Sequence, residues 1–314
     1  MENISAEELR KYIEKVLFGE TALDLSGRQL SKVPEAVTDL EDLEILHLYG
    51  NNLTELPTNI NKLKNLTLLN LGENQLTYLP DSIGELKELS RLFVRNNQLS
   101  AVPTSVQYLN KLEELYLDGN QLTDLPDRIG DLKELKVLSV RNNQLSAVPI
   151  CVRQLKQLGR LDLDGNQLRD LPEWIGDLKE LRMLSVRNNQ LSVVPTCVQK
   201  LKQLGRLDLD SNQLRDLPEW IGDLKELRML SVRNNQLSAV PTCVQQLKEL
   251  MLLYMDGNQL IDLPEWIADL EKLRWLYLRD NPFTSTVDGM RSALKLTDKK
   301  KGETTKIDFT GGYN

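Results

Sequence analysis

The chain has 314 residues, of which 27% are charged and 40% are hydrophobic, and its formal net charge is −7. A single hydrophobic core rarely serves more than about 250–300 residues, so this length predicts either two domains or an array of repeats. The acidic balance argues against nucleic acid and anionic membrane surfaces as partners, because binding to both begins with clustered Lys and Arg, and the only basic run is Lys299 to Lys301.

No apolar stretch approaches the roughly 18–20 residues of a membrane-spanning helix, so membrane insertion is not expected. The first residues, MENISAEELRKYIEK, lack the basic-then-apolar order of a secretory signal. This predicts a cytoplasmic protein, and export by a signal-independent route stays open. The three cysteines are odd in number and share the spacing of their surroundings, which agrees with a reducing compartment.

Residues 1–19 are predicted to form an N-terminal capping helix. Ser5 to Glu8 spell a capping box at the start of a helix. The apolar residues that follow at helical spacing are Leu9, Tyr12, Ile13, Val16 and Leu17. We expect this helix to cover one end of the core that the rest of the chain builds.

Residues 20–283 repeat with a period of 23. Asn recurs at this step from Asn51 to Asn281 and Pro from Pro34 to Pro264, and each unit reads LxxLxLxxNxLxxLPxxIxxL. The alternation of buried-type Leu with other residues in LxLx predicts a strand that buries one face. No unit can bury its leucines alone, so neighbouring units are expected to stack as parallel strands around one shared core.

This pattern resembles bacterial leucine-rich repeat proteins of the 23-residue LPxxI type, including spirochaetal and intracellular-pathogen proteins, and it is similar to the repeats of Ras-associated scaffold proteins. The resemblance implies an α/β fold: a right-handed solenoid, or horseshoe, of about twelve coils, with a concave parallel β-sheet and a convex side of short helical or irregular segments. It also implies that each repeated Asn lies inside the turn after its strand, where its amide satisfies buried backbone groups.

Both ends of the array depart from the pattern. Arg28 stands where the first coil should have Asn, as terminal repeats often differ from internal ones. Asn281 to Phe283 end the last strand and turn. Residues 284–314 are predicted to form a C-terminal cap and flexible tail, with a helix over residues 287–296 and the tail from residue 297 onward.

One row of side chains on the predicted sheet alternates in charge. Residues 23 apart lie side by side on adjacent strands about 4.8 Å apart, so the exposed position two before each Asn forms a row. From Arg95 to Arg279 this row alternates Arg and Asp, because the units duplicate in pairs of 46 residues. The proposed structural charge ladder comprises Asp118, Arg141, Asp164, Arg187, Asp210, Arg233 and Asp256. We favour a self-neutralising ladder, in which like charges never lie opposite, over a charged docking surface.

Aromatic residues gather toward both ends of the neighbouring concave row and are absent from its middle. Exposed aromatic residues beside Arg are frequent anchors of protein interfaces. The first candidate binding patch comprises His47, Tyr49, Arg91, Phe93, Arg95 and Tyr116. The second comprises Tyr254, Trp275, Tyr277 and Arg279. The second patch has an equally good structural explanation, as a cover for the last coil beneath the C-terminal segment, so the first is the better candidate.

A second alternation occurs on the predicted convex side, two residues after Pro. The large residues in this slot are Trp174, Trp220 and Trp266, and those of the alternate coils are Cys151, Cys197 and Cys243. We favour a packing ridge of large and small residues, with self-association through the Trp residues as the alternative. The cysteines lie two coils apart, about 9–10 Å, beyond the roughly 7 Å Cα separation that a disulfide spans, so no disulfide or zinc cluster is expected.

Catalytic motifs are nearly absent. His47 is the only histidine, and no Gly-rich phosphate loop, CxxC or HExxH sequence occurs. Residues 162–166 faintly resemble a calcium loop but lack its downstream Glu. We therefore predict no enzyme, cofactor or metal site, and a module that binds a protein ligand, of unknown identity, on its concave face. The alternative is a secreted effector or surface-exposed adhesin of a pathogen that contacts host proteins.

Overall fold

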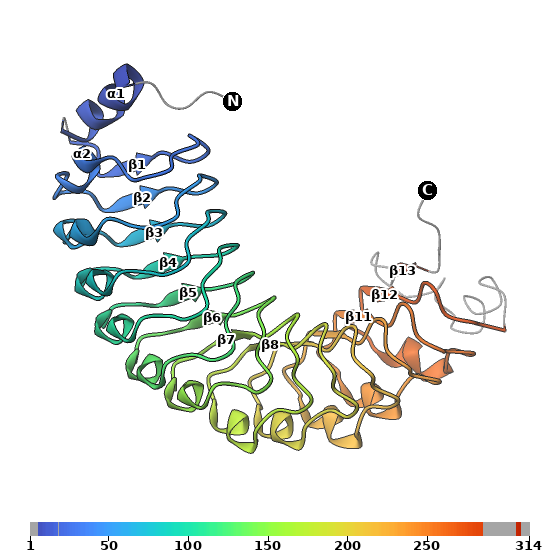
Figure 1. Ribbon diagram of the computed structural model, residues 1–314. Coiled ribbons are helices and arrows are strands. Elements are labelled where there is room, and N and C mark those ends of the chain that lie inside the picture. The colour runs from blue at the N-terminus through green and yellow to red at the C-terminus, as the bar shows by residue number, and fades with distance from the viewer. Residues whose placement is uncertain (1–5, 18, 285–305, 309–314) are drawn as a thin grey trace. The chain divides into compact units, whose positions relative to one another are not determined.

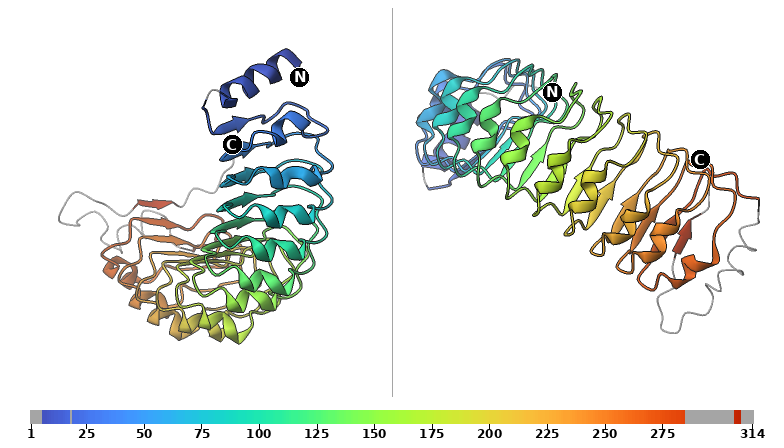
Figure 2. Two further views of the ribbon diagram at one scale, coloured as in Figure 1. Left: turned by 90° about the vertical axis from the view of Figure 1, so that its left-hand side faces the viewer. Right: turned by 90° about the horizontal axis from the view of Figure 1, so that it is seen from below.

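The protein is described by a computed structural model that covers residues 6–17, 19–284 and 306–308 (Figure 1). The chain divides into two compact units, residues 1–160 and 161–314. Both are built from stacked coils, each with a three-residue strand and a short helix on the opposite side of the coil (Figure 2). The repeat solenoid with parallel strands that the sequence predicts is confirmed within each unit.

The first unit contains an N-terminal helix, α1 (Ala6–Leu17), and six parallel strands that pair in order. The strands are β1 (Ala22–Asp24), β2 (Ile45–His47), β3 (Leu68–Asn70), β4 (Arg91–Phe93), β5 (Glu114–Tyr116) and β6 (Val137–Ser139). The short helices are α2 (Glu35–Thr38), η1 (Thr58–Lys62), η2 (Asp81–Glu85), η3 (Thr104–Tyr108), η4 (Asp127–Asp131) and η5 (Ile150–Gln154).

The second unit repeats this plan, and strand β7 (Arg160–Asp162) spans the boundary between the units. The strands that follow are β8 (Met183–Ser185), β9 (Arg206–Asp208), β10 (Met229–Ser231), β11 (Leu252–Tyr254), β12 (Trp275–Tyr277) and β13 (Lys306–Asp308). The short helices are η6 (Glu173–Asp177), η7 (Thr196–Lys200), η8 (Glu219–Asp223), η9 (Thr242–Gln246) and η10 (Glu265–Asp269).

The strand register follows the 23-residue period. Leu46 pairs with Leu69 in the first unit, and Leu207 pairs with Leu230 in the second. These middle residues of the strands are completely buried. Each η helix begins directly after a Pro, whose fixed φ and missing N–H suit the entry to a helical turn. The repeated leucines therefore form one layer of core per coil, and none of the described helices is long and apolar enough to cross a lipid bilayer.

The repeated Asn holds neighbouring coils together through its side-chain amide. Asn97 is 7% exposed, and its Nδ2 donates to Leu71 O at 3.0 Å and to Val94 O at 3.2 Å. Its Oδ1 accepts the backbone N–H of Leu76 at 3.0 Å. One buried side chain thus satisfies backbone groups of its own coil and of the coil before it, as the resemblance implied.

The first coil departs from this pattern because it carries the cap. Arg28 occupies the Asn position, and its guanidinium reaches helix α1 instead of the turn. Its Nη1 lies 2.9 Å from Glu8 Oε1, and its Nη2 donates to Tyr12 Oη at 2.7 Å. On the same helix Val16 is buried. The substitution of Arg for Asn therefore fastens α1 to the solenoid. Ser5, the first residue of the predicted capping box, lies outside the described residues.

The last described element differs from the expectation of a flexible tail. Lys306–Asp308 forms strand β13, which pairs in parallel with β12 so that Ile307 lies opposite Leu276. The offset between these strands is not the 23-residue step, because β13 belongs to no repeat. The predicted helix over residues 287–296 and the rest of the tail lie outside the described residues.

Replacing Asn97 by Ala is expected to lower the free energy of unfolding by about 2 kcal/mol, because the N–H of Leu76 is left unpaired in the core and the carbonyls of Leu71 and Val94 each lose one of their two amide donors. Denaturant unfolding, together with hydrogen exchange at the Leu76 amide, measures the effect. The control is Gln98→Ala at the adjacent exposed position, which should change stability little. Equal effects of the two substitutions would contradict this role of Asn97.

Candidate protein-binding surface

Within each unit, one face of the sheet is left uncovered by the coils that form it. The middle residue of each strand enters the leucine core, and the residues before and after it point to the other side, which we call the open face. This is the face that the sequence predicts to be concave. Both candidate patches and the charge ladder lie on it, the first patch in the first unit and the second patch in the second.

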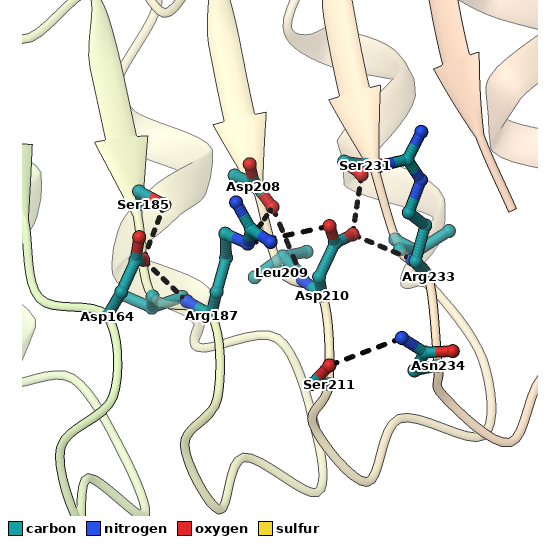
Figure 3. A network of polar contacts seen from close by, with 12 residues as sticks. Asp164, Ser185, Arg187, Asp208, Leu209, Asp210, Ser211, Ser231, Arg233 and Asn234 are labelled. Carbon is teal, nitrogen blue, oxygen red and sulfur yellow. Dashed lines mark hydrogen bonds and ion pairs between the residues drawn. The ribbon is translucent and has the colours of Figure 1, made fainter. Parts of the chain in front are cut away.

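The charge ladder is held by a repeated set of contacts, shown for the second unit in Figure 3. One oxygen of Asp210, Oδ1, accepts the Ser231 hydroxyl at 2.5 Å and the backbone N–H of Arg233 at 2.8 Å. The other oxygen lies 3.5 Å from Nε of Arg187 in the preceding coil. Each Asp thus joins an Arg side chain on one side to an Arg main chain on the other.

The same arrangement recurs in the first unit at Asp118. Its carboxylate accepts the backbone N–H of Arg141 at 3.0 Å and the Ser139 hydroxyl, and it lies 2.8 Å from Nε of Arg95. In the alternating row, each of these Asp carboxylates therefore has two Arg neighbours: one contributes its side chain and the other its backbone N–H. It requires coils in pairs, because two Asp coils in succession would bring two carboxylates together.

The ladder is less exposed than the sequence suggested. We expected its positions to be exposed, but Asp164 and Asp210 are only 7% and 2% exposed. Asp164 accepts the Ser185 hydroxyl at 2.5 Å and the backbone N–H of Arg187 at 2.8 Å, which draw its carboxylate down onto the sheet. The expectation of exposed positions was wrong at Asp164 and Asp210 because hydroxyl and amide donors bind their carboxylates from the side of the sheet.

The first patch contains an aromatic stack under an arginine. The rings of Phe93 and Tyr116 lie 4.8 Å apart at an interplanar angle of 6°. The guanidinium of Arg95 lies 3.9 Å from the centre of the Tyr116 ring. Tyr116 is consequently 9% exposed, and burial together with the Glu114 carboxylate, which accepts its hydroxyl at 3.1 Å, raises its pKa. Tyr116 therefore supports the patch more than it offers a contact surface.

The remaining members of the first patch divide into two groups. Arg91 is exposed on the same strand as Phe93. His47 and Tyr49 lie two strands away, separated from Phe93 by Asn70 of β3. Tyr49 is 42% exposed, and its ring lies close to Gly72 of the next coil. The structure therefore brings together four of the six predicted residues, and the other two flank them.

The second patch is also a stack, but its arginine differs from the predicted one. The rings of Tyr254 and Tyr277 lie 4.5 Å apart, and Trp275 stacks on Tyr277 at 5.9 Å. The cation over Tyr254, at 4.1 Å, is Arg233, which was predicted only as a member of the ladder. Its position 21 residues before Tyr254, like that of Arg95 before Tyr116, was the signal that could have found it. Arg279 contributes its backbone N–H to Asp256.

Two further features of the second patch were missed. Met229, Leu252 and Trp275 are consecutive register partners on β10, β11 and β12, and all three are half-buried on the open face. A three-residue apolar row was visible in the sequence at the 23-residue step. In addition, β13 lies directly beside Trp275 and Tyr277. The alternative interpretation, that these two residues cover the last coil beneath the C-terminal segment, stays a prediction.

Between the patches in sequence, Asp replaces the Tyr beneath the arginine. Asp208 is 1% exposed and lies 3.7 Å from Nε of Arg187 and 3.3 Å from Nη2 of Arg206. Burial, and then the adjacent carboxylate of Asp210, raises the pKa of Asp208, and Arg187 opposes the shift. Arg187 is therefore drawn between two carboxylates (Figure 3), whereas Arg233 lies over a ring.

The other face of the coils carries the alternating large and small slot. Trp174, Trp220 and Trp266 are half-buried, and Cys151, Cys197 and Cys243 are buried free thiols. Burial raises the pKa of each thiol to about 12, so the reactive thiolate is negligible near neutral pH. Self-association through the tryptophans stays a prediction. Among the described residues, no group of three or more His, Cys, Asp or Glu side chains is arranged to hold a metal ion.

The coils of this face also pack in pairs. A Cβ added at Gly176 would lie 2.7 Å from the backbone oxygen of Cys197, and one at Gly222 would lie 2.9 Å from that of Cys243. The coils of Trp174 and Trp220, each followed by a Cys coil, therefore need a glycine where the backbone of that Cys coil touches them. The position is Gly at 130, 176 and 222, in coils with Asp two before the Asn, and Gln or Arg in the alternate coils, for example Gln199; the last Asp coil, which no Cys coil follows, has Ala268 there.

Known proteins share this architecture. A family model described as a leucine-rich repeat region matches residues 15–116, 115–206 and 198–297. The chain is 36% identical to a leucine-rich repeat protein of Leptospira interrogans, with a TM-score of 0.85 and with 95% of this chain and 74% of that chain covered. No match was found among curated proteins.

Two further solved structures are similar over most of this chain. YopM, a leucine-rich effector protein from Yersinia pestis, is 29% identical with a TM-score of 0.68, and the match covers 89% of this chain and 70% of that one. The plant peptide hormone receptor RGFR1, in complex with RGF2, is 28% identical with a TM-score of 0.65. That match covers 80% of this chain and 45% of the receptor chain.

Replacing Asp208 by Asn is expected to raise the melting temperature at pH 7. Folding raises the pKa of this carboxyl above its ordinary value of 3.8, so the folded state disfavours the charged form. The wild-type protein therefore loses stability as pH rises from 3.8 through the raised pKa, and the amide does not share this loss. The advantage of Asp208→Asn should shrink as pH falls toward 3.8.

Differential scanning calorimetry at several pH values provides the measurement. Asp177→Asn, at an exposed carboxylate of the same unit, is the matched control and should show no comparable gain at pH 7. A lower melting temperature for Asp208→Asn at pH 7 would show that the attraction of Arg187 and Arg206 outweighs the cost of burial.

Proposed function

Because the chain belongs to the leucine-rich repeat family, we propose that it is a non-enzymatic interaction module that binds a protein ligand on the open face of its first unit. The observation that carries the proposal is the aromatic stack of Phe93 and Tyr116 beneath Arg95, with Arg91 exposed on the same strand. Aromatic residues and Arg dominate the energetic centres of protein interfaces.

The composition of this face also favours a protein over a small molecule. The first patch extends across neighbouring strands and includes the exposed Tyr49, so it offers a broad surface. Arg95 is held against the Tyr116 ring and Asp118, which lowers the entropy that it loses on binding. The similar receptor RGFR1 was solved with its partner RGF2, which supports a protein or peptide as the ligand. We propose that the second patch chiefly supports β13, since that strand pairs with β12, which carries Trp275 and Tyr277.

Affinity capture with the tagged full chain, followed by mass spectrometry, tests the proposed surface. The double variant Arg91→Ser with Phe93→Ser removes contact groups without changing a buried leucine. It should reduce the captured ligand at least tenfold, with circular dichroism and melting temperature close to wild type. Met183→Ser occupies the slot of Arg91 on the open face of the second unit and serves as the matched control. If that control loses the ligand equally, or the double variant retains it, the surface is misplaced.

A second function, that of an effector delivered to host cells, is favoured by the similarity to YopM over 89% of this chain. We propose it as the alternative to a purely cytoplasmic role. Fusing the chain to a reporter that is modified only in host cytosol should give signal in infected host cells. A reporter retained in the bacterial cytosol, beside a delivered positive control, would contradict this role and favour the cytoplasmic one.

A further inference from the structure

We infer that Arg91 and Arg95 form a receptor for carboxylates, and that the ligand docks through an extended acidic segment in which acidic side chains flank an apolar one. The inference rests on the proposed binding surface and specifies its chemistry. Three observations support it: Arg95 is fixed by two contacts, the outer edge of its guanidinium is exposed, and Phe93 and Arg91 lie beside it on the same strand.

Arg95 is held in place from two sides. Its guanidinium lies 3.9 Å from the centre of the Tyr116 ring, and its Nε lies 2.8 Å from Asp118 Oδ2. Asp118 is itself fixed by the backbone N–H of Arg141 at 3.0 Å and by the Ser139 hydroxyl. An arginine ordered in this way loses little conformational entropy when it binds a ligand.

The outer edge of this guanidinium is open. The Arg95 side chain is 42% exposed despite its two contacts. Within residues 6–17, 19–284 and 306–308, its terminal nitrogens donate no hydrogen bond. Planar arginine presents paired N–H groups that match the two oxygens of a carboxylate, which a neutral group cannot satisfy equally well. The open edge therefore selects an acidic group.

Arg91 and Phe93 extend the receptor along the strand. Arg91, Phe93 and Arg95 are alternate residues of one chain segment, so they face the same side at a spacing of about 6.6 Å. Arg91 is exposed and makes no ion pair or hydrogen bond through its side chain with any described residue. An extended ligand matches this spacing if it has an apolar residue with one acidic residue two positions before it and another two positions after it.

The second unit contains the same arrangement of an arginine over a tyrosine, and a variant of it with an aspartate in place of the tyrosine. Arg233 lies 4.1 Å over Tyr254 and 2.8 Å from Asp256, as Arg95 does over Tyr116 and beside Asp118. Arg187 instead has Asp208 in the place of the tyrosine and is drawn between carboxylates (Figure 3). The residue 21 positions after the arginine thus decides what lies beside the guanidinium: the ring of a Tyr, or the carboxylate of an Asp, which competes with an acidic ligand for the same cation.

Fluorescence anisotropy with labelled, end-blocked peptides tests the inference on the full chain. The probe carries Glu-Gly-Leu-Gly-Glu, and the matched control carries Gln-Gly-Leu-Gly-Gln. All proteins carry Arg233→Gln so that the equivalent arginine of the second unit does not contribute. We expect the Glu probe to bind at least tenfold more tightly than the Gln probe, and Arg95→Gln to reduce this preference to less than twofold. Equal binding of the two probes would overturn the inference.

Three further arms separate the possible explanations. Arg187→Gln, at the position flanked by the carboxylates of Asp208 and Asp210, should leave the preference unchanged, and loss there would show a general charge effect. Tyr116→Asp retains Arg95 but should abolish the preference, because the new carboxylate competes with the Glu side chains of the probe, and a retained preference would contradict this role of the residue beneath Arg95. A peptide with no Glu but a free C-terminal carboxylate should bind like the Gln probe, and binding like the Glu probe would assign the site to a chain terminus instead.

The natural ligand distinguishes this inference from the proposed function. If the captured protein is lost from the Arg91→Ser with Phe93→Ser variant but retained by Arg95→Gln, the surface is correct and the carboxylate receptor is wrong. If Arg95→Gln alone reduces capture at least tenfold with an unchanged melting temperature, the result supports both the binding surface and the carboxylate receptor. If neither variant affects capture, the surface itself is misplaced, whatever the peptides show.

Discussion

The amide of the repeated asparagine is the contact on which each stack of coils depends. At Asn189, Nδ2 donates to Leu163 O and Val186 O, and Oδ1 accepts the N–H of Leu168. These groups belong to two successive coils and are buried, so their register cannot slip by one residue without leaving polar groups unpaired. The fixed 23-residue step follows from this requirement, and it places every open-face residue beside its counterpart one period away.

Once the register is fixed, the alternating charges determine how the side chains of the open face are arranged. Within each unit the carboxylates of the ladder accept main-chain and hydroxyl donors from one neighbour and approach a guanidinium of the other, as Asp118 and Asp210 do. A guanidinium then rests either on a ring or between carboxylates. The open face is therefore an array of similar arginines in different surroundings. Its capacity for recognition depends on which arginines remain accessible after their own coils have bound them.

Much of this architecture could be predicted from the sequence because the repeat is redundant. The strand positions, the Asn contacts and the charge alternation each recur many times, so a few principles applied at one coil describe the others. The exposure of the ladder could not be predicted in the same way. It depends on the rotamers of Asp164 and Ser185, whose hydrogen bond draws the carboxylate down, and spacing alone does not specify a side-chain direction.

The candidate site was predicted in outline and corrected in detail. The aromatic clusters were visible as departures from the repeat, but the stack that buries Tyr116 and the placement of Arg233 over Tyr254 depend on contacts between coils. Strand β13 could not be predicted because Lys306–Asp308 has no repeat signature. Non-repeating segments contain only their local sequence as a signal, whereas each coil is reinforced by its neighbours.

The close approach of Gly176 to the carbonyl of Cys197 has a consequence for how such an array can change in length. A lone extra coil would place either a side chain against that carbonyl or two carboxylates against each other. Gain or loss of whole 46-residue pairs preserves both junctions at once. Lineages that carry this array should therefore differ from one another by even numbers of coils, and artificial versions should be lengthened or shortened in the same increment.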